Sequence, residues 1–550
     1  MATGSGQRPD RGADALAAAM AGEGVDRVFS LSGNHIMVLY DALLEAGVDL
    51  VHVRHEGAAV HMADAWSRLT GATGVALLTG GPGHANGISA LYTALAAESP
   101  MVLLSGQAPL ADAGRGAFQE IDQVALAAPL VKASLCATAP QEVGHAFSRA
   151  VAIARAGRPG PVYLSLPSDV LEGAVVDREA ARVRAPGAPA SAPLPAVAAD
   201  AIVHRLRQSR RPLVLAGPAC MAGGAQAAVR ALADAAGVPV LGMESPRGVN
   251  DPSLGAFAEV LAEADQVVLV GKPIDFTLRL GAALPTGAAV TVIDPDPAMI
   301  ARAQRALGAG RVELSAVAAA VHALEALAEA AARGGGPIAP DWAARVATAV
   351  AWRPPAWETV AAREPGRLHP VQMCRALQPL LDADPSAVLV VDGGEIGQWA
   401  QSCLRAPTRI INGVAGSIGS ALPFAVAASL ARPGATVVAV LGDGTFGFHP
   451  AEFDTAVRSG ARFVAVVGND QCWNAEHQIQ LREYGAARAR GCELLPTRYD
   501  RVAEGFGGHG EFVTTADDLP GALARACSSG LPACVNVLIE SHPAPVLRRG

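Results

Sequence analysis

The chain has 550 residues, half of them hydrophobic and few of them aromatic, with a formal net charge of −8. At roughly 150 residues per domain, this length predicts three or four domains with aliphatic, alanine-rich cores. The negative charge and the lack of a basic cluster argue against a nucleic-acid-binding protein.

The cysteines and the apolar runs narrow the class further. Eight cysteines are scattered without a C-x-x-C pair, so neither a disulfide framework nor a zinc site is indicated, and a cytoplasmic location is expected. No apolar run reaches membrane-spanning length, and the polar leader Met1–Arg11 does not have the pattern of a signal peptide.

Residues 12–181 alternate apolar strands with alanine-rich helical stretches, which predicts a doubly wound parallel sheet. Glu56 follows the second strand, in VRHEGAAVHMADAWSR, and begins a helix. Its carboxylate could simply favour the helix dipole, by under about 1 kcal/mol, or it could serve chemistry. The strands are expected at Arg27–Leu31, Leu50–Arg54, Val75–Thr79 and Met101–Ser105.

A proline- and alanine-rich stretch, Arg182–Val197, predicts a linker to a second α/β domain at 198–333. No G-x-G-x-x-G fingerprint occurs there, so a nicotinamide-dependent oxidoreductase is not supported. Asp294, at the end of a strand, could accept a hydrogen bond from a ribose hydroxyl. Arg247 and Lys272 could meet phosphates or be solvated surface charges. The strands are expected at Pro212–Ala216, Pro239–Met243, Gln266–Val270 and Ala289–Asp294.

The third domain, 341–550, carries two acidic strand ends. An expected strand at Ala435–Leu441 runs into Gly442-Asp443-Gly444, and another at Phe463–Val467 runs into Gly468-Asn469-Asp470. Because parallel strands end at the same edge, the two carboxylates could meet there. Such oxygen ligands suit Mg²⁺ bound to phosphates, although turn-forming Gly and Asp would look the same. A further strand is expected at Ala387–Val391.

Three phrases resemble thiamine diphosphate enzymes. Gly442-Asp443-Gly444, followed after 27 positions by Asp470, is similar to their diphosphate-Mg²⁺ motif, which usually has Asn-Asn instead of Asn469-Asp470. The R-H-E phrase at Glu56 and the turn Gly80–Gly83 with Asn86 resemble two other motifs. Over almost the whole chain, the three regions are similar to the pyrimidine-binding, central and diphosphate-binding domains of the pyruvate oxidase-like group. That group includes 2-hydroxyacyl-CoA lyase, oxalyl-CoA decarboxylase, benzaldehyde lyase and acetolactate synthase.

The resemblance implies roles for these residues. Glu56 would hydrogen-bond the pyrimidine ring of the cofactor and so activate it. The metal ligands would be Asp443, Asp470 and the backbone carbonyl of Cys472. The segment Gly416-Ser417-Ile418 would hold the cofactor bent, with Ile418 beneath its two rings. Three residues after a strand, Gly393, Gly394 and Glu395, would line the diphosphate or substrate side.

Three residues are candidates for contact with substrate. His35, in LSGNHI, resembles a histidine of benzaldehyde lyase and could shuttle a proton near neutral pH, or it could be structural. Gln119 matches a pocket glutamine of benzaldehyde lyase and acetolactate synthases. Glu476 matches a catalytic glutamate of pyruvate decarboxylase-type enzymes, or it is a surface residue. Trp473 and His477 would shape the same wall, or Trp473 belongs to the core.

The expected activity is that of a C–C lyase or carboligase acting on 2-hydroxyacyl compounds, including their CoA thioesters. The alternatives are an acetolactate synthase, a 2-oxo acid or oxalyl-CoA decarboxylase, and a non-catalytic regulatory subunit. The central domain would bind CoA, an ADP group or FAD, and the chain would form a homotetramer built as a dimer of dimers. Arg548 and Arg549, at the C-terminal tail, would either be solvated or close over a charged substrate.

Overall fold

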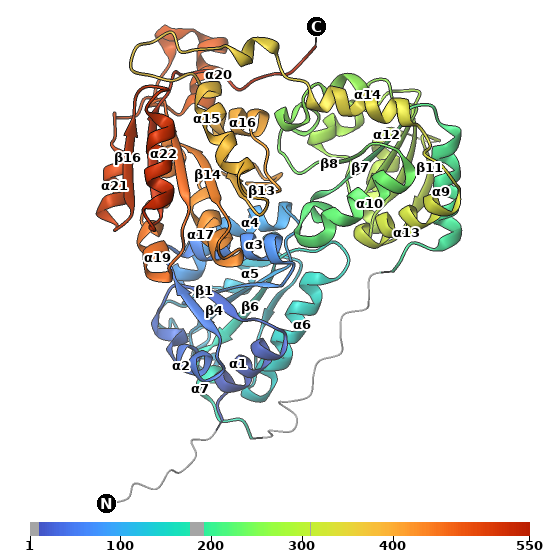
Figure 1. Cartoon of the computed structure of the whole chain (residues 1–550). Coiled ribbons are helices and arrows are strands. Elements are labelled where there is room, and N and C mark those ends of the chain that lie inside the picture. Colours follow the sequence, from blue (N-terminus) through green and yellow to red (C-terminus); the bar gives the residue numbers. More distant parts are fainter. Residues whose placement is uncertain (1–9, 177–191, 309, 550) are drawn as a thin grey trace, which may run out of the picture. The chain divides into compact units, whose positions relative to one another are not determined.

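The computed structural model describes residues 10–176, 192–308 and 310–549, which belong to two compact units. The first unit contains one sheet, and the second, from residue 192 onward, contains two (Figure 1). Every pair of named strands in the described residues is parallel. The predicted fold class, three doubly wound α/β domains, is confirmed.

The first sheet has the strand order β2-β1-β3-β4-β6-β5. Figure 1 shows α1 and α6 on one side of it and α3 and α4 on the other, so its apolar strands are covered on both faces. The strands are β1 (Arg27–Ser30), β2 (Asp49–His52), β3 (Gly74–Leu78), β4 (Met101–Gln107), β5 (Ser134–Cys136) and β6 (Val162–Pro167). The helices are α1 (Gly12–Gly22), α2 (Met37–Glu45), α3 (Glu56–Thr70), α4 (Pro82–Ala96), α5 (Gln123–Ala127), α6 (Val143–Arg155) and α7 (Ser168–Glu172).

The second sheet has the order β11-β10-β9-β7-β8. Alternate residues of β7 belong to two buried clusters, Leu213 and Leu215 with α11, α12 and α14, and Val214 and Ala216 with α9, α10 and α13. The strands are β7 (Pro212–Ala216), β8 (Val240–Gly242), β9 (Gln266–Val270), β10 (Ala289–Ile293) and β11 (Val312–Ala316). The helices are α9 (Ala196–Gln208), α10 (Gln226–Ala236), α11 (Phe257–Leu261), α12 (Pro297–Leu307), α13 (Ala320–Arg333) and α14 (Pro340–Ala351).

The third sheet has the order β13-β12-β14-β15-β17-β16. An apolar cluster packs the strands against α15, α16 and α22. The strands are β12 (Val388–Val391), β13 (Thr408–Ile411), β14 (Val437–Gly442), β15 (Val464–Asn469), β16 (His509–Val513) and β17 (Ala533–Leu538). The helices are α15 (Pro370–Asp382), α16 (Gly394–Cys403), α17 (Ala421–Ala431), α18 (Asp443–Phe446), α19 (Glu452–Ser459), α20 (Asn474–Tyr484), α21 (Tyr499–Gly505) and α22 (Leu519–Ser528).

The strands predicted from sequence are all present, with ends that move by no more than about two residues. β14 and β15 run on through Gly442 and Asn469, which were expected to be turn residues. Most of the predicted linker, Arg182–Val197, lies outside the described residues, and the domain boundaries stay predictions. No helix of the described chain is long and apolar enough to cross a membrane.

Candidate functional site

The site in the second unit begins at the carboxyl edge of the third sheet. Parallel pairing aligns Gly442 of β14 with Gly468 of β15, so the chain leaves both strands at the same edge. Asp443 follows the first glycine as the opening residue of α18, and Asp470 follows β15. Both residues line one cavity, as the sequence predicted.

The electrostatics of this pair favour a cation. Asp443 is buried, and burial raises its pKa to about 6, against several backbone hydrogen bonds that lower it. Burial and then the charge of Asp443 raise the pKa of Asp470 to about 8. Asp443 Oδ1 accepts from the Gly444 backbone at 3.0 Å, whereas its buried Oδ2 has no hydrogen-bond partner among the described residues. Two crowded carboxylates with a vacant acceptor oxygen suit a divalent metal ion.

The turn after β15 has a strained backbone. Gln471 has φ of +62°, which is uncommon for a residue other than glycine. The Asn469 side chain accepts from the Gln471 backbone at 3.2 Å, and Cys472 forms an antiparallel bridge with Glu493. The turn is thereby held from both sides, and Cys472 lines the cavity beside Asp470.

The cavity has a volume of about 300 Å³ and brings together most of the residues predicted in this unit. Those lining it are Glu395, Gly416, Ile418, Gly442, Asp443, Gly444, Asp470, Cys472 and Glu476. Ser417 is not among the lining residues, but its carbonyl accepts from Asn412 at 2.7 Å, which fixes the segment around it. A side chain at position 444 would clash with the ring of Trp473, since a Cβ there would lie 2.6 Å from it.

Two exposed residues also line the cavity. Glu476 is exposed and also lines the cavity, so its placement fits both of its sequence interpretations. Arg247 is exposed too, but it lines the cavity and lies 3.4 Å from Glu395. Burial raises the pKa of Glu395, and the positive charge of Arg247 lowers it. The sequence indicated neither this pairing nor its place at the cavity.

Asp392 was missed as an organiser of the site, although an acid directly after the buried strand β12 was a usable signal. Its fully buried carboxylate accepts from the backbone of Gly393 at 2.7 Å, of Gly419 at 3.0 and 3.1 Å, and of Ala421 at 3.0 Å. Burial raises its pKa to about 6. One side chain thus ties the loop before α16 to the segment that follows Ile418.

The residues expected to bind a nucleotide in the second sheet are engaged within the protein. Lys272 is buried and pairs with Asp275 at 3.2 Å. Asp294 is buried and accepts from the Asp296 backbone at 2.9 Å. These contacts give both charges partners inside the protein.

The first unit gathers its own candidates at the carboxyl edge of its sheet. Glu56 opens α3 and is buried, and Asn86 of α4 donates to its Oε2 at 3.1 Å. A Cβ on Gly83 would lie 3.5 Å from Glu56 Oε1, so the glycine turn lies close to the buried carboxylate. Of the two glutamate oxygens, only Oε2 has a side-chain hydrogen-bond partner among the described residues.

His35 and Gln119 lie beside the same glycine turn. His35 is buried, contacts Thr79 Oγ1 at 3.2 Å and stacks on Phe118 with the ring centres 6.2 Å apart. Burial lowers its pKa, which favours the neutral imidazole. Gln119, with φ of +59°, packs against Gly81, where a Cβ would meet its carbonyl at 2.6 Å.

These residues fit a metal-bound diphosphate. The crowded carboxylates and the vacant Oδ2 of Asp443 match a hard cation, and the glycine-lined wall leaves backbone open to phosphate oxygens. The backbone N–H groups at the start of α16 lie at this wall and favour an anion. Most of the site residues predicted for the third domain line the cavity in which such a ligand could be held.

Comparison with known proteins gives three family matches along the chain. The N-terminal thiamine pyrophosphate (TPP) binding domain of thiamine pyrophosphate enzymes matches residues 10–126, the central domain matches 199–327, and the C-terminal TPP binding domain matches 392–537. A probable acetolactate synthase of Mycobacterium bovis is 36% identical, covering 96% of this chain and 95% of its own. The 2-hydroxyacyl-CoA lyase 2 of Danio rerio is 30% identical, with 97% and 92% covered. The catabolic acetolactate synthase of Raoultella terrigena is also 30% identical, with 98% and 96% covered.

Proposed function

The chain belongs to the thiamine pyrophosphate enzyme family, and from that membership we propose a Mg²⁺-dependent lyase and carboligase acting on 2-hydroxyacyl compounds. We take CoA thioesters as the leading substrate class. The proposal of a metal-bound cofactor rests on one observation: Asp443 and Asp470 line the same glycine-lined cavity, and one buried oxygen of Asp443 has no hydrogen-bond partner among the described residues. Relatives named as a probable acetolactate synthase and as a 2-hydroxyacyl-CoA lyase support the reaction type.

In this proposal, different residues of the chain bind the metal ion, bind the diphosphate and hold a proton at the cofactor. Asp443, Asp470 and the Cys472 carbonyl hold Mg²⁺, and the start of α16 receives the diphosphate. Thiamine diphosphate, when bound, supplies the nucleophile and the electron sink at the substrate carbonyl. Glu56 holds a proton at the pyrimidine ring, and Ile418 supports the bent cofactor.

The substrate part of the proposal depends on the proton-transfer groups. His35 is held neutral by burial and is suited to take the proton of a substrate hydroxyl. Glu476, at the cavity wall, is suited to return a proton to the product. Cleavage of a 2-hydroxyacyl-CoA breaks the bond between the hydroxyl-bearing carbon and the thioester carbon, and it yields an aldehyde or ketone and formyl-CoA.

Acetolactate synthesis is the second candidate, because the relatives at 36% identity carry that name. Against it stands Ser32-Gly33-Asn34-His35, which replaces the Pro-Gly-Gly phrase that acetolactate synthases have after the first strand. The two candidates predict different products from the same purified protein.

The test is to load the protein with thiamine diphosphate and Mg²⁺ and to supply either a 2-hydroxyacyl-CoA or pyruvate. The proposal expects aldehyde and formyl-CoA from the thioester, measured by mass spectrometry, with Glu56→Gln as the inactive control. Conversion of pyruvate to acetolactate, with the thioester left intact, would replace the proposal by the second candidate.

A further inference from the structure

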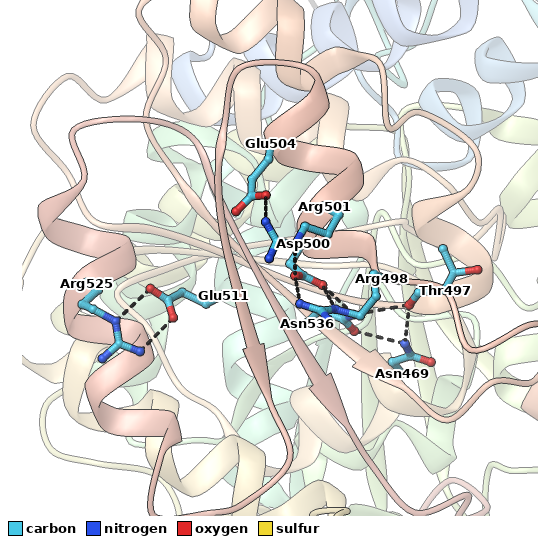
Figure 2. Close-up of polar contacts among 9 residues, drawn as sticks. All are labelled: Asn469, Thr497, Arg498, Asp500, Arg501, Glu504, Glu511, Arg525 and Asn536. Atoms are coloured by element: carbon cyan, nitrogen blue, oxygen red, sulfur yellow. Dashed lines mark hydrogen bonds and ion pairs between the residues drawn. The ribbon is translucent and has the colours of Figure 1, made fainter.

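A chain of buried polar side chains lies behind the turn that carries Asp470 (Figure 2). Asn469 at the end of β15, Asn536 in β17 and Asp500 in α21 are all nearly inaccessible to solvent. Asn469 Nδ2 donates to Asn536 Oδ1 at 3.1 Å, and Asn536 Nδ2 donates to Asp500 Oδ1 at 3.2 Å. Arg498 donates to both oxygens of Asp500, at 2.9 and 2.6 Å.

The other end of this chain reaches the turn itself. Asn469 Oδ1 accepts from the backbone N–H of Gln471 at 3.2 Å. Gln471 is the residue with φ of +62°, and it lies between the two expected metal ligands of the turn, Asp470 and Cys472. A conformation of this kind is unfavourable for a residue other than glycine and persists only where its surroundings enforce it.

Asn469 can enforce that conformation only if its amide is fixed in one orientation. Its Nδ2 also donates to the Thr497 carbonyl at 3.2 Å, so both ends of the amide are engaged. Asn536 is oriented in the same way, between Asp500 and that carbonyl at 3.4 Å. The network is rigid because its side chains are buried and their polar groups are hydrogen-bonded. A substitution at its far end should therefore alter the geometry of the turn.

We propose that Asn536 and Asp500 are positioning residues that fix the turn of Asp470 and Cys472 and so set the affinity of the site for its divalent metal ion. Neither residue lines the cavity, so each acts only through Asn469. The inference rests on the metal site of the proposed function and is independent of the substrate class.

The experiment measures Mn²⁺ binding by electron paramagnetic resonance in the presence of thiamine diphosphate, with the urea unfolding midpoint recorded beside it. Asn536→Leu keeps the side-chain size and removes the amide, and Asp500→Asn keeps the shape and removes the charge. Glu511→Gln is the matched control, because it weakens the Glu511–Arg525 ion pair of β16 and α22 (2.9 and 2.8 Å) and does not touch the network (Figure 2). Asp470→Ala tests the metal site itself.

The expected result is a Kd for Mn²⁺ at least about tenfold higher in Asn536→Leu and Asp500→Asn, as for other groups that orient a metal ligand, and unchanged in Glu511→Gln. If Asn536→Leu does not fold, Asp500→Asn decides the question. Wild-type affinity in a folded network variant would overturn the proposal, as would an equal loss in Glu511→Gln. Wild-type affinity in Asp470→Ala would instead overturn the metal assignment and leave the substrate question untouched.

Discussion

Glu56 and Asp443 are both carboxylates at the first residue of a helix, and their surroundings predict different results when each is changed. Glu56 accepts a hydrogen bond from Asn86, and its proposed role is to hold a proton at the pyrimidine ring of the cofactor. Glu56→Gln keeps the shape of the side chain and should remove only this proton transfer. We expect unchanged binding of thiamine diphosphate and Mg²⁺ by calorimetry, with turnover lower by about a hundredfold or more. Turnover near the wild-type rate would contradict this role.

Asp443 is expected to be needed for binding itself. Asp443→Ala removes the oxygen that has no hydrogen-bond partner among the described residues, and Asp470 alone would not complete the proposed metal site. Calorimetry should show that the variant loses cofactor binding, while Glu56→Gln, measured in parallel, keeps it. Cofactor affinity that is unchanged in Asp443→Ala would refute the metal assignment.

Site residues can be predicted from the sequence when the pattern that marks them lies in neighbouring positions of the chain. Asp443 and Asp470 directly follow buried strands, and Glu56 follows a strand and opens a helix, so each is visible from its neighbours in the chain. Arg247 could not be placed in this way, because its partner Glu395 belongs to helix α16, 148 positions away. Asn536 likewise interrupts an apolar strand, and its role can be recognised only from its hydrogen bond with Asn469 in the folded chain.

At the scale of elements, the strands predicted from sequence include most of those flanked on both sides in a sheet, together with two edge strands, β2 and β8. The edge strands β5, β11, β13 and β16 were not predicted, since they are partly solvent-exposed and lack an unbroken apolar run. The buried strands β6 and β17 were also missed. Each carries a polar residue, Ser165 or Asn536, whose partners lie elsewhere in the fold.

The free energy of unfolding should depend on pH through Asp392, which ties together the loops around α16. Because burial raises its pKa from 3.8 to about 6, the folded chain keeps a proton that the unfolded chain has lost between these values. The contribution of Asp392 to the free energy of unfolding is therefore largest at low pH, and it falls as the pH rises through about 6. At about 1.4 kcal/mol per unit, the loss amounts to about 3 kcal/mol.

Asp392→Asn cannot ionise, so urea unfolding of both proteins at pH 4.5 and 7.5 isolates this effect. The unfolding free energy of the variant, relative to that of the wild type, should rise by about 2 kcal/mol between the two pH values, because about 1.5 pH units lie between pH 4.5 and the folded pKa of about 6. A difference between the two proteins that does not change with pH would contradict the assignment of a raised pKa to Asp392.

The C-terminal segment 541–549 forms neither helix nor strand, but it is held in place. Asn474 donates to the His542 carbonyl at 2.9 Å, and Arg549 pairs with Glu259 of α11 at 2.8 Å, so Arg549 is not a free solvated charge. If this segment closes over a charged substrate, Arg549 exchanges Glu259 for a phosphate. Deleting residues 546–550 should then raise the apparent KM for an acyl-CoA and leave turnover of a small uncharged acyloin unchanged.

Glu259→Gln is the matched variant for this prediction. It frees Arg549 without shortening the chain, so the apparent KM for the acyl-CoA should fall rather than rise. Equal losses on both substrates after the deletion would indicate general destabilisation, and no loss on either would leave the segment without a part in binding.

At the scale of the whole molecule, the proposed chemistry draws on both compact units. The proton-transfer candidates Glu56 and His35 belong to the first unit, and the metal-binding edge belongs to the second. In the enzymes that this chain resembles, the first domain of one subunit faces the third domain of another. We therefore expect each complete site to need two copies of the chain.

The last prediction is that the protein is a homodimer at least, and a tetramer by the same resemblance. Phe118 is 71% exposed and stacks on His35, so it is a large apolar side chain that a second copy would cover. Light scattering should give a mass of two or more chains for the wild type and a smaller mass for Phe118→Glu. Val197→Glu, a change at another exposed apolar residue, should keep the wild-type mass. Turnover per chain should fall on dilution as sites lose their second copy, and a monomer that stays fully active would refute the prediction.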